Sequence, residues 1–242
     1  MSTTGHTDPS PTGFEAVLDA LDAERRSRRT VMSTSADRAA RVVREQVVEG
    51  LLQSGTRLPE ARLGAALGVS RNTLREALSQ LVAERILVRE AHRGVVVATP
   101  GADDVRDVYA VRLLVEPAAL QHGTALAAAT SRMRAAVDEG RTALERGDHA
   151  GVGNANQHFH RAVVATAGSP RLDAQMDLLL AEMRLIFHQM GDPAAFHSPY
   201  LEDNARICDL VEAGDRAGAA AHLAGYLEKA RDHLLAGLPR PA

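Results

Sequence analysis

The chain has 242 residues, a formal net charge of −3 and 45% hydrophobic residues, enough to bury the core of one large domain or two modest ones. Cys208 is the single cysteine, which excludes an intrachain disulfide, and no apolar run approaches the roughly 18 residues that span a membrane. Residues 1–11 are polar and lack the apolar core of a signal peptide, so we expect a soluble, cytoplasmic protein.

Charge is distributed unevenly along the chain. Residues 35–100 hold 10 Arg against 7 Asp and Glu, a net charge of +3. Residues 101–242 hold 14 Lys and Arg against 19 Asp and Glu, a net charge of −5. Because contacts with phosphate need basic side chains, we expect nucleic-acid binding in the first segment and not in the second.

The N-terminal extension, residues 1–34, is expected to be disordered or partly helical. Residues 1–13 are rich in Ser, Thr, Pro and Gly. From Phe14 to Leu21 apolar side chains recur at helical spacing, and a basic run over residues 25–29 follows. This segment is either a basic arm that contacts DNA or a frayed helix whose charges are solvated.

Residues 35–99 have the pattern of a helix-turn-helix. A first helix is expected over residues 36–53, and a short second helix over residues 60–67. Gly68 then supplies a tight turn, and Ser70 can cap a third helix by accepting a hydrogen bond from a backbone N–H. A short helix, a glycine turn and a Ser-capped helix together are typical of DNA-binding proteins.

The third helix carries the side chains that recognition of a major groove requires. Arg71 and Arg75 are four residues apart and share one face, with Asn72 and Thr73 beside them. Apolar residues at spacings of three and four cover the other face: Leu74, Leu78, Leu81 and Val82. Arginine forks bind guanine edges or phosphates, so this helix is predicted to enter the groove. The alternative is an ordinary surface helix with solvated arginines.

Two short β-branched runs follow, at residues 86–88 and 95–97. The residues between them, 89–94, include two Arg and one His. This pattern predicts a hairpin with a basic tip, the wing of a winged helix.

The rest of the chain shows only helical periodicity. Pro100 and Gly101 form a natural linker, and Pro117 is expected to kink the helix that contains it. Six helices are expected, over residues 103–128, 130–146, 149–167, 170–190, 198–213 and 215–236. Amphipathic helices with short loops form an antiparallel bundle. The predicted fold is therefore mostly α, with an N-terminal winged helix-turn-helix domain (35–99), an all-helical bundle (100–236) and a short tail (237–242).

These motifs resemble the bacterial GntR-type transcription regulators, and specifically the FadR subfamily with its FCD ligand-binding domain. The resemblance is carried by residues 67–71, residues 74–78, Arg93-Gly94 of the wing, and the C-terminal half. An arginine that is frequent in the family ten residues before Arg71 is Ala61 here, with Arg62 next to it. The resemblance implies a set of DNA-binding residues: Arg62, Ser70, Arg71, Asn72, Thr73, Arg75, His92, Arg93 and Gly94.

The resemblance also implies an effector pocket in the bundle, lined by Arg112, Asn156, His160, Asn204 and His222. Many members of the subfamily bind a divalent metal there through one Asp and three His. Here Asn156 and Asn204 stand at two of the four positions, and His160 and His222 at the others. Because amide oxygens are poor ligands for transition metals, we expect a weak or absent site for Zn²⁺ or Ni²⁺. A small carboxylate held by Arg112 is the expected effector.

We therefore expect a homodimeric regulator that binds an operator in double-stranded DNA and responds to that effector, and not an enzyme. Two alternatives stay open. One is a metal-dependent enzyme built on the bundle, although the two asparagines argue against it. The other is an architectural DNA-binding protein whose bundle only dimerises.

Overall fold

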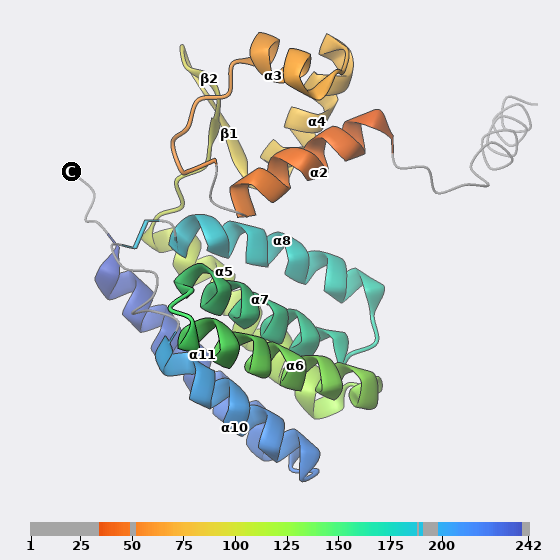
Figure 1. Ribbon diagram of the computed structural model, residues 1–242, viewed down its shortest axis with the longest axis vertical. Coiled ribbons are helices and arrows are strands. Elements are labelled where there is room, and N and C mark those ends of the chain that lie inside the picture. Colours follow the sequence, from red (N-terminus) through yellow and green to blue (C-terminus); the bar gives the residue numbers. More distant parts are fainter. Residues whose placement is uncertain (1–33, 49–51, 188, 191–197, 239–242) are drawn as a thin grey trace, which may run out of the picture.

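A computed structural model of the protein describes residues 34–48, 52–187, 189–190 and 198–238. The expectations for residues 1–33, including the basic run, lie outside this range. Within it, no helix is both long and apolar enough to cross a membrane. Figure 1 shows a winged helix at one end of the molecule and a helical bundle below it, which confirms the predicted fold class.

The winged helix consists of three helices and a hairpin. Its elements are α2 (Ser35–Val48), α3 (Glu60–Leu67), α4 (Arg71–Ala83), β1 (Leu87–Glu90) and β2 (Gly94–Val97). The two strands pair antiparallel, with Leu87 opposite Val97 and Glu90 opposite Gly94, as the β-branched runs predict. Alternation along the hairpin turns Leu87, Val95 and Val97 toward the helices, where they join one apolar core with Leu74, Leu78 and Leu81 of α4.

The turn between α3 and α4 follows from two residues. Gly68 ends α3 with a φ of 65°, in the left-handed region that glycine adopts without a steric penalty. Two residues later the Ser70 hydroxyl accepts a hydrogen bond from the Thr73 backbone N–H at 3.2 Å. Both the glycine turn and the serine cap were expected, and together they fix the direction in which α4 leaves the turn.

The bundle contains six α-helices within the described residues. They are α5 (Ala102–His122), α6 (Leu126–Glu145), α7 (His149–Ala165), α8 (Pro170–Phe187), α10 (Leu201–Glu212) and α11 (Arg216–Gly237), and a 3-10 turn, η1 (Ser198–Tyr200), precedes α10. Helix α5 continues through Pro117.

Several predicted helix boundaries are wrong. The helix expected over residues 36–53 is no longer helical at Leu52 and Gln53, and the helix expected to begin at residue 130 begins at Leu126. A third boundary has a clear physical cause. The first bundle helix ends at His122 and not at residue 128. A Cβ at Gly123 would lie 2.3 Å from the Thr166 carbonyl oxygen, so only glycine allows the chain to pass this close to the end of α7. That same oxygen accepts a hydrogen bond from the Ala125 N–H. The break is therefore set by a contact distant in sequence, which periodicity does not reveal.

Helix α8 belongs to the bundle in sequence but also packs against the winged helix, as Figure 1 shows. Its Ala181 and Leu185 are buried in the same apolar cluster as Val43 and Val47 of α2. Other α8 residues, such as Met183 and Ile186, lie in the core of the bundle. Helix α8 therefore contributes side chains to both cores and links the bundle to the winged helix.

Candidate functional sites

Helix α4 presents its basic side chains to solvent and its apolar side chains to the core. Arg71, Asn72 and Arg75 are exposed, whereas Leu74 is 2% exposed. The Arg75 guanidinium is 3.6 Å from Glu60 of α3, with 70% of the arginine side chain exposed. Such a pair is worth about 1 kcal/mol or less, so Arg75 can exchange it for a phosphate or a base.

The tip of the wing has the geometry of a tight turn. His92 and Gly94 have φ values of 66° and 79°, and both are exposed together with Arg93. Arg93 is held by Glu90 at 2.7 Å. Arg89 is not among the residues expected to bind DNA, but it donates a hydrogen bond to Ser79 of α4 at 3.2 Å and so adds a guanidinium beside that helix.

Arg62 is exposed on α3. All the residues expected to bind DNA therefore lie on α3, on α4 with its cap, or at the wing tip. Ser70 differs from the others in role, because its hydroxyl is used in capping α4 and contacts the Thr73 hydroxyl at 2.8 Å.

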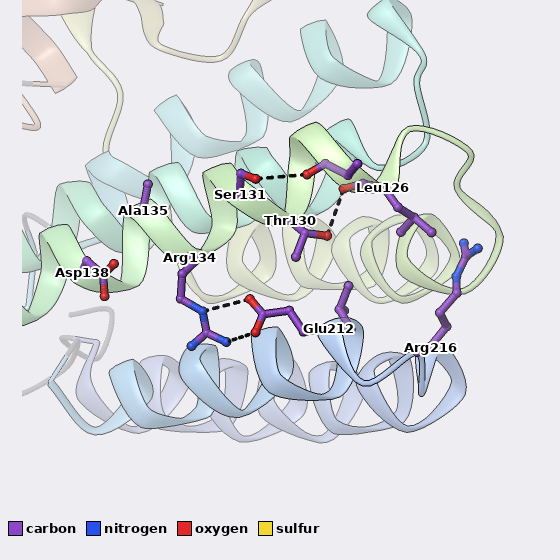
Figure 2. A pocket seen from close by; sticks show the side chains of 11 residues that line it. Leu126, Thr130, Ser131, Arg134, Ala135, Asp138, Glu212 and Arg216 are labelled. Atoms are coloured by element: carbon purple, nitrogen blue, oxygen red, sulfur yellow. Dashed lines mark hydrogen bonds and ion pairs between the residues drawn. The ribbon is translucent and has the colours of Figure 1, made fainter.

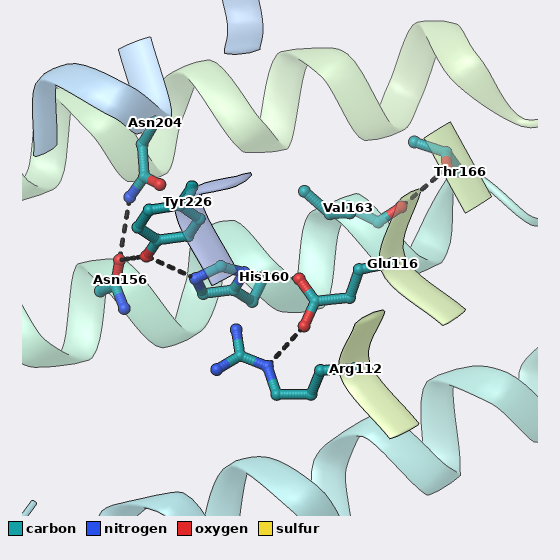
Figure 3. Close-up of polar contacts among 8 residues, drawn as sticks. All are labelled: Arg112, Glu116, Asn156, His160, Val163, Thr166, Asn204 and Tyr226. Atoms are coloured by element: carbon teal, nitrogen blue, oxygen red, sulfur yellow. Dashed lines mark hydrogen bonds and ion pairs between the residues drawn. The ribbon is translucent and has the colours of Figure 1, made fainter. Parts of the chain in front are cut away.

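Inside the bundle, three ionisable side chains form a buried chain of contacts, shown in Figure 3. The Arg112 Nε donates to Glu116 Oε1 at 2.6 Å, one helical turn away on α5. The other carboxylate oxygen, Oε2, is 2.6 Å from His160 Nδ1 on α7. Both oxygens of Glu116 are thus engaged, and Glu116 is 0% exposed.

The chain continues through neutral polar groups to α10 and α11. The Tyr226 hydroxyl is 2.9 Å from His160 Nε2 and 3.2 Å from Asn156 Oδ1. Asn204 Nδ2 donates to the same Asn156 oxygen at 2.9 Å. We call these six residues the buried polar network: Arg112, Glu116, Asn156, His160, Asn204 and Tyr226.

Two atoms of the buried polar network are buried without a hydrogen-bond partner among the described residues: Arg112 Nη2 and Asn204 Oδ1. Each such atom costs about 1–3 kcal/mol relative to a satisfied one. An unsatisfied buried group in an otherwise paired network marks a place where a ligand or a water can bind.

Electrostatics decide which groups of the network are charged. Burial raises the pKa of Glu116, but Arg112 and His160 outweigh it and hold that pKa below its ordinary value of 4.5. Burial lowers the pKa of His160 below 6.5, although Glu116 opposes the shift. At neutral pH Arg112 and Glu116 are therefore charged and His160 is neutral. A neutral His160 donates from Nδ1 to Glu116, and its Nε2 then competes with Asn156 Oδ1 for the single proton of the Tyr226 hydroxyl.

The structure brings together Arg112, Asn156, His160 and Asn204, as the sequence analysis expected, but not His222. The His222 Nε2 contacts Asp203 at 2.9 Å, and 36% of its side chain is exposed. Tyr226, one turn further along α11, occupies the place in the buried polar network that we expected for His222. The signal for this in the sequence was Tyr226 itself, a polar aromatic residue four positions after His222 and therefore on the same helical face.

The donor set of the buried polar network does not fit a divalent transition metal. Only one imidazole is present, and both of its nitrogens are engaged by Glu116 and Tyr226. The two asparagines supply neutral amides, and Arg112 adds a positive charge within the same buried chain. Within the described ranges, no cluster of three or more His, Cys, Asp and Glu is suited to a metal ion.

A separate surface pocket of about 740 Å³ lies between α6 and the loop that joins α10 to α11. Figure 2 shows that its central arginine, Arg134, faces Glu212, with a 2.8 Å ion pair. The hydroxyls of Thr130 and Ser131 are bonded to carbonyls of their own helix. Its main polar groups are thus already paired, and the pocket contains none of the expected effector-binding residues.

Family models match both halves of the chain. Residues 35–97 match the bacterial regulatory proteins of the gntR family, and residues 107–229 match the FCD domain. The matched families consist of transcriptional regulators and not enzymes.

Individual relatives agree with these matches. The chain is 33% identical over 149 residues to the uncharacterized HTH-type transcriptional regulator BphR of Paraburkholderia xenovorans, covering 58% of this chain and 61% of that protein. It is 39% identical over 79 residues to the gluconate operon transcriptional repressor of Bacillus licheniformis, covering 33% and 32%. The chain thus spans less than two thirds of the length of these curated relatives. A crystal structure from Rhodococcus sp. RHA1, assigned as a GntR transcriptional regulator, superposes with a TM-score of 0.78 at 36% identity, covering 84% of this chain and 99% of that one.

Proposed function

The chain belongs to the GntR family of bacterial transcriptional regulators and carries an FCD domain, and from this we propose that it binds an operator through α4 and the wing and is regulated by a small molecule at the buried polar network. The observation that supports the effector site is the pair of unpartnered buried atoms, Arg112 Nη2 and Asn204 Oδ1. The carboxylate class of effector stays a prediction from the sequence.

On the DNA side, Arg71 and Arg75 are the groups proposed to reach base edges or phosphates. Both stand on the exposed face of a capped helix whose other face is buried, so the helix can enter a groove without uncovering its core. His92 and Arg93 at the wing tip are proposed to contact the neighbouring backbone or groove. Arg62 is proposed as a further phosphate contact from α3.

A route from the buried polar network to the winged helix is available through α8. Gln157, next to Asn156 on α7, is buried and donates from Nε2 to the Leu180 carbonyl oxygen of α8 at 3.1 Å. The next residue, Ala181, lies in the core of the winged helix. A ligand that moves Asn156 would therefore move a hydrogen bond that holds α8 in register.

We propose that the protein acts as a homodimer, because two winged helices on one face of DNA gain affinity through their physical link. Helix α5 offers a surface for this contact. Leu114 is 76% exposed, the highest value among the exposed large apolar side chains of the described residues, and Val111 on the preceding turn is 38% exposed. A sedimentation mass near the 25.8 kDa of one chain at micromolar concentration would contradict the dimer. If α5 forms the contact, Leu114→Glu should weaken dimerisation.

The regulator can be tested in two steps that use the full chain. DNA that the wild type selects from a random pool should contain two related half-sites. Selection with Arg71→Ala should no longer enrich these half-sites. Incubation of the protein with metabolite pools, followed by native mass spectrometry, should then retain a small molecule on the wild type and not on Asn204→Leu. Selected DNA without any retained molecule would favour the architectural alternative.

A further inference from the structure

The two unpartnered atoms of the buried polar network have opposite requirements. Arg112 Nη2 is a hydrogen-bond donor and needs an acceptor, whereas Asn204 Oδ1 is an acceptor and needs a donor. Their side chains are 3% and 1% exposed, so bulk water does not satisfy them. A ligand that fits both atoms must carry an acceptor and a donor.

The charge of Arg112 is already balanced inside the protein. Glu116 binds its Nε at 2.6 Å and is held ionised by Arg112 and His160. The hydroxyls of Tyr109 and Tyr226 stay neutral, because burial raises the pKa of both. The network therefore has no net charge before any ligand enters. An anion bound at Arg112 would add a second negative charge beside Glu116, where little water screens the repulsion.

We propose that the effector is an uncharged molecule with an amide or hydroxyl group, and that Glu116 is the residue that excludes anions. This inference rests on the proposed effector site and departs from the carboxylate that Arg112 alone suggests. A simple carboxylate such as acetate supplies acceptors only, so it would leave Asn204 Oδ1 without a donor, whereas a hydroxy acid such as lactate carries a donor and is disfavoured by its charge alone. An amide or a hydroxyl supplies both, and its neutrality leaves the Arg112–Glu116 pair intact.

Glu116 also provides the variant that tests the idea. Glu116→Gln keeps the size of the side chain and an oxygen that can accept from Arg112, but removes the internal counter-charge. The buried arginine then lacks its anion, so the site should take one from solution. The charge preference of the site should reverse, while Asn204 still requires a donor.

The experiment compares acid and amide partners of nearly equal shape on the full-length protein. The probes are acetate with acetamide, L-lactate with L-lactamide, and D-gluconate with D-gluconamide, at matched ionic strength. Thermal unfolding and calorimetry are measured for the wild type, Glu116→Gln and the control Asn204→Leu. For at least one pair, we expect the amide to bind the wild type about tenfold or more tightly than the acid, because like charges at close range cost several kcal/mol. In Glu116→Gln the acid should become the better ligand, and in Asn204→Leu the response to the amide should disappear.

The outcomes separate this inference from the proposed effector site. Tighter binding of the acid to the wild type would overturn the uncharged class but keep the site. No response to any probe in any of the three proteins would overturn this inference, while retention of a molecule in native mass spectrometry decides separately whether the effector site exists. If Glu116→Gln does not fold, the acid–amide comparison on the wild type decides alone.

Discussion

Two pairs of residues, each separated by one helical turn, show how differently the two halves of the protein use arginine. Arg71 and Arg75 on α4 carry like charges, and both face solvent. Arg112 and Glu116 on α5 carry opposite charges, and both are buried. The first pair slightly destabilises the free helix and becomes favourable when an anionic partner neutralises it. The second pair satisfies itself and is costly to disturb, so the same residue type binds a polymer in one place and maintains neutrality in the other.

The largest effect that tests this comparison is expected from Arg112→Met. It leaves Glu116 buried without its counter-charge, which should lower the free energy of unfolding by about 3–5 kcal/mol. The double variant Arg112→Met/Glu116→Leu should recover most of the loss, because no charge then remains unpaired. Urea denaturation of both variants measures this. An equal loss in both would show that the arginine acts through packing and not through its charge.

Whether the bundle can hold a metal is tested by replacing the asparagines with side chains that bind metal well. Asn156→Asp, Asn204→His and Tyr226→His together would place one carboxylate and three imidazoles around the position of His160, a set suited to Zn²⁺. At a Zn²⁺ concentration of 100 times the dissociation constant, linkage should raise the free energy of unfolding by about 2.7 kcal/mol. The same variant with Tyr226 retained is the control. Should that control bind as tightly, His222 would be the third imidazole despite its contact with Asp203.

The exposed pair is tested by Arg71→Ala and Arg75→Ala. Each should cost about 1–3 kcal/mol of operator binding if it makes a bidentate base contact, measured by titration against selected DNA. Unlike the loss of Arg112, neither change should alter the free energy of unfolding by more than about 0.5 kcal/mol. Arg171→Ala, an exposed arginine on α8, serves as the control for charge alone. Unchanged DNA affinity in both α4 variants would remove this helix from the groove.

The smallest effect is a pH dependence from the buried pair and its histidine. The folded-state pKa values of His160 and Glu116 are both lowered, so the unfolded state binds more protons. The contribution of these two groups to the free energy of unfolding should therefore be fully present above about pH 6.5. It should decrease below that pH as His160 of the unfolded state takes up a proton, and decrease again below about pH 4.5 as Glu116 of the unfolded state does. His160→Gln should remove the first step only. A stability maximum on the acid side would contradict these shifts.

The turn, the recognition helix and the wing could be predicted from the sequence, because their signals are local, whereas the first helix was expected to extend further, to residue 53. Gly68, Ser70 and the apolar spacing of α4 each act within a few residues, and the structure has them as expected. The break at Gly123 escaped prediction, because the carbonyl that forces it belongs to Thr166, 43 positions away.

The buried polar network was predictable only in part. Resemblance to a family located Arg112, Asn156, His160 and Asn204, but it misplaced the last position by one helical turn, at His222. Tyr226 and the central role of Glu116 emerge only when α5, α7 and α11 are packed together. Helical periodicity reveals which face of a helix is buried but not which turn meets which neighbour.

The shared use of α8 affects how this protein can be divided or recombined. Residues 34–99 look like an independent module that ends at Pro100, yet Ala181 and Leu185 complete its core from far along the chain. A fragment that ends at the linker would leave those contacts open, and a module of this size has little buried area to spare. A chimera that grafts this winged helix onto another bundle should therefore also transplant the face of α8 that it packs against. Exchange of winged-helix domains between relatives would then be limited by α8 of the bundle and not by the linker.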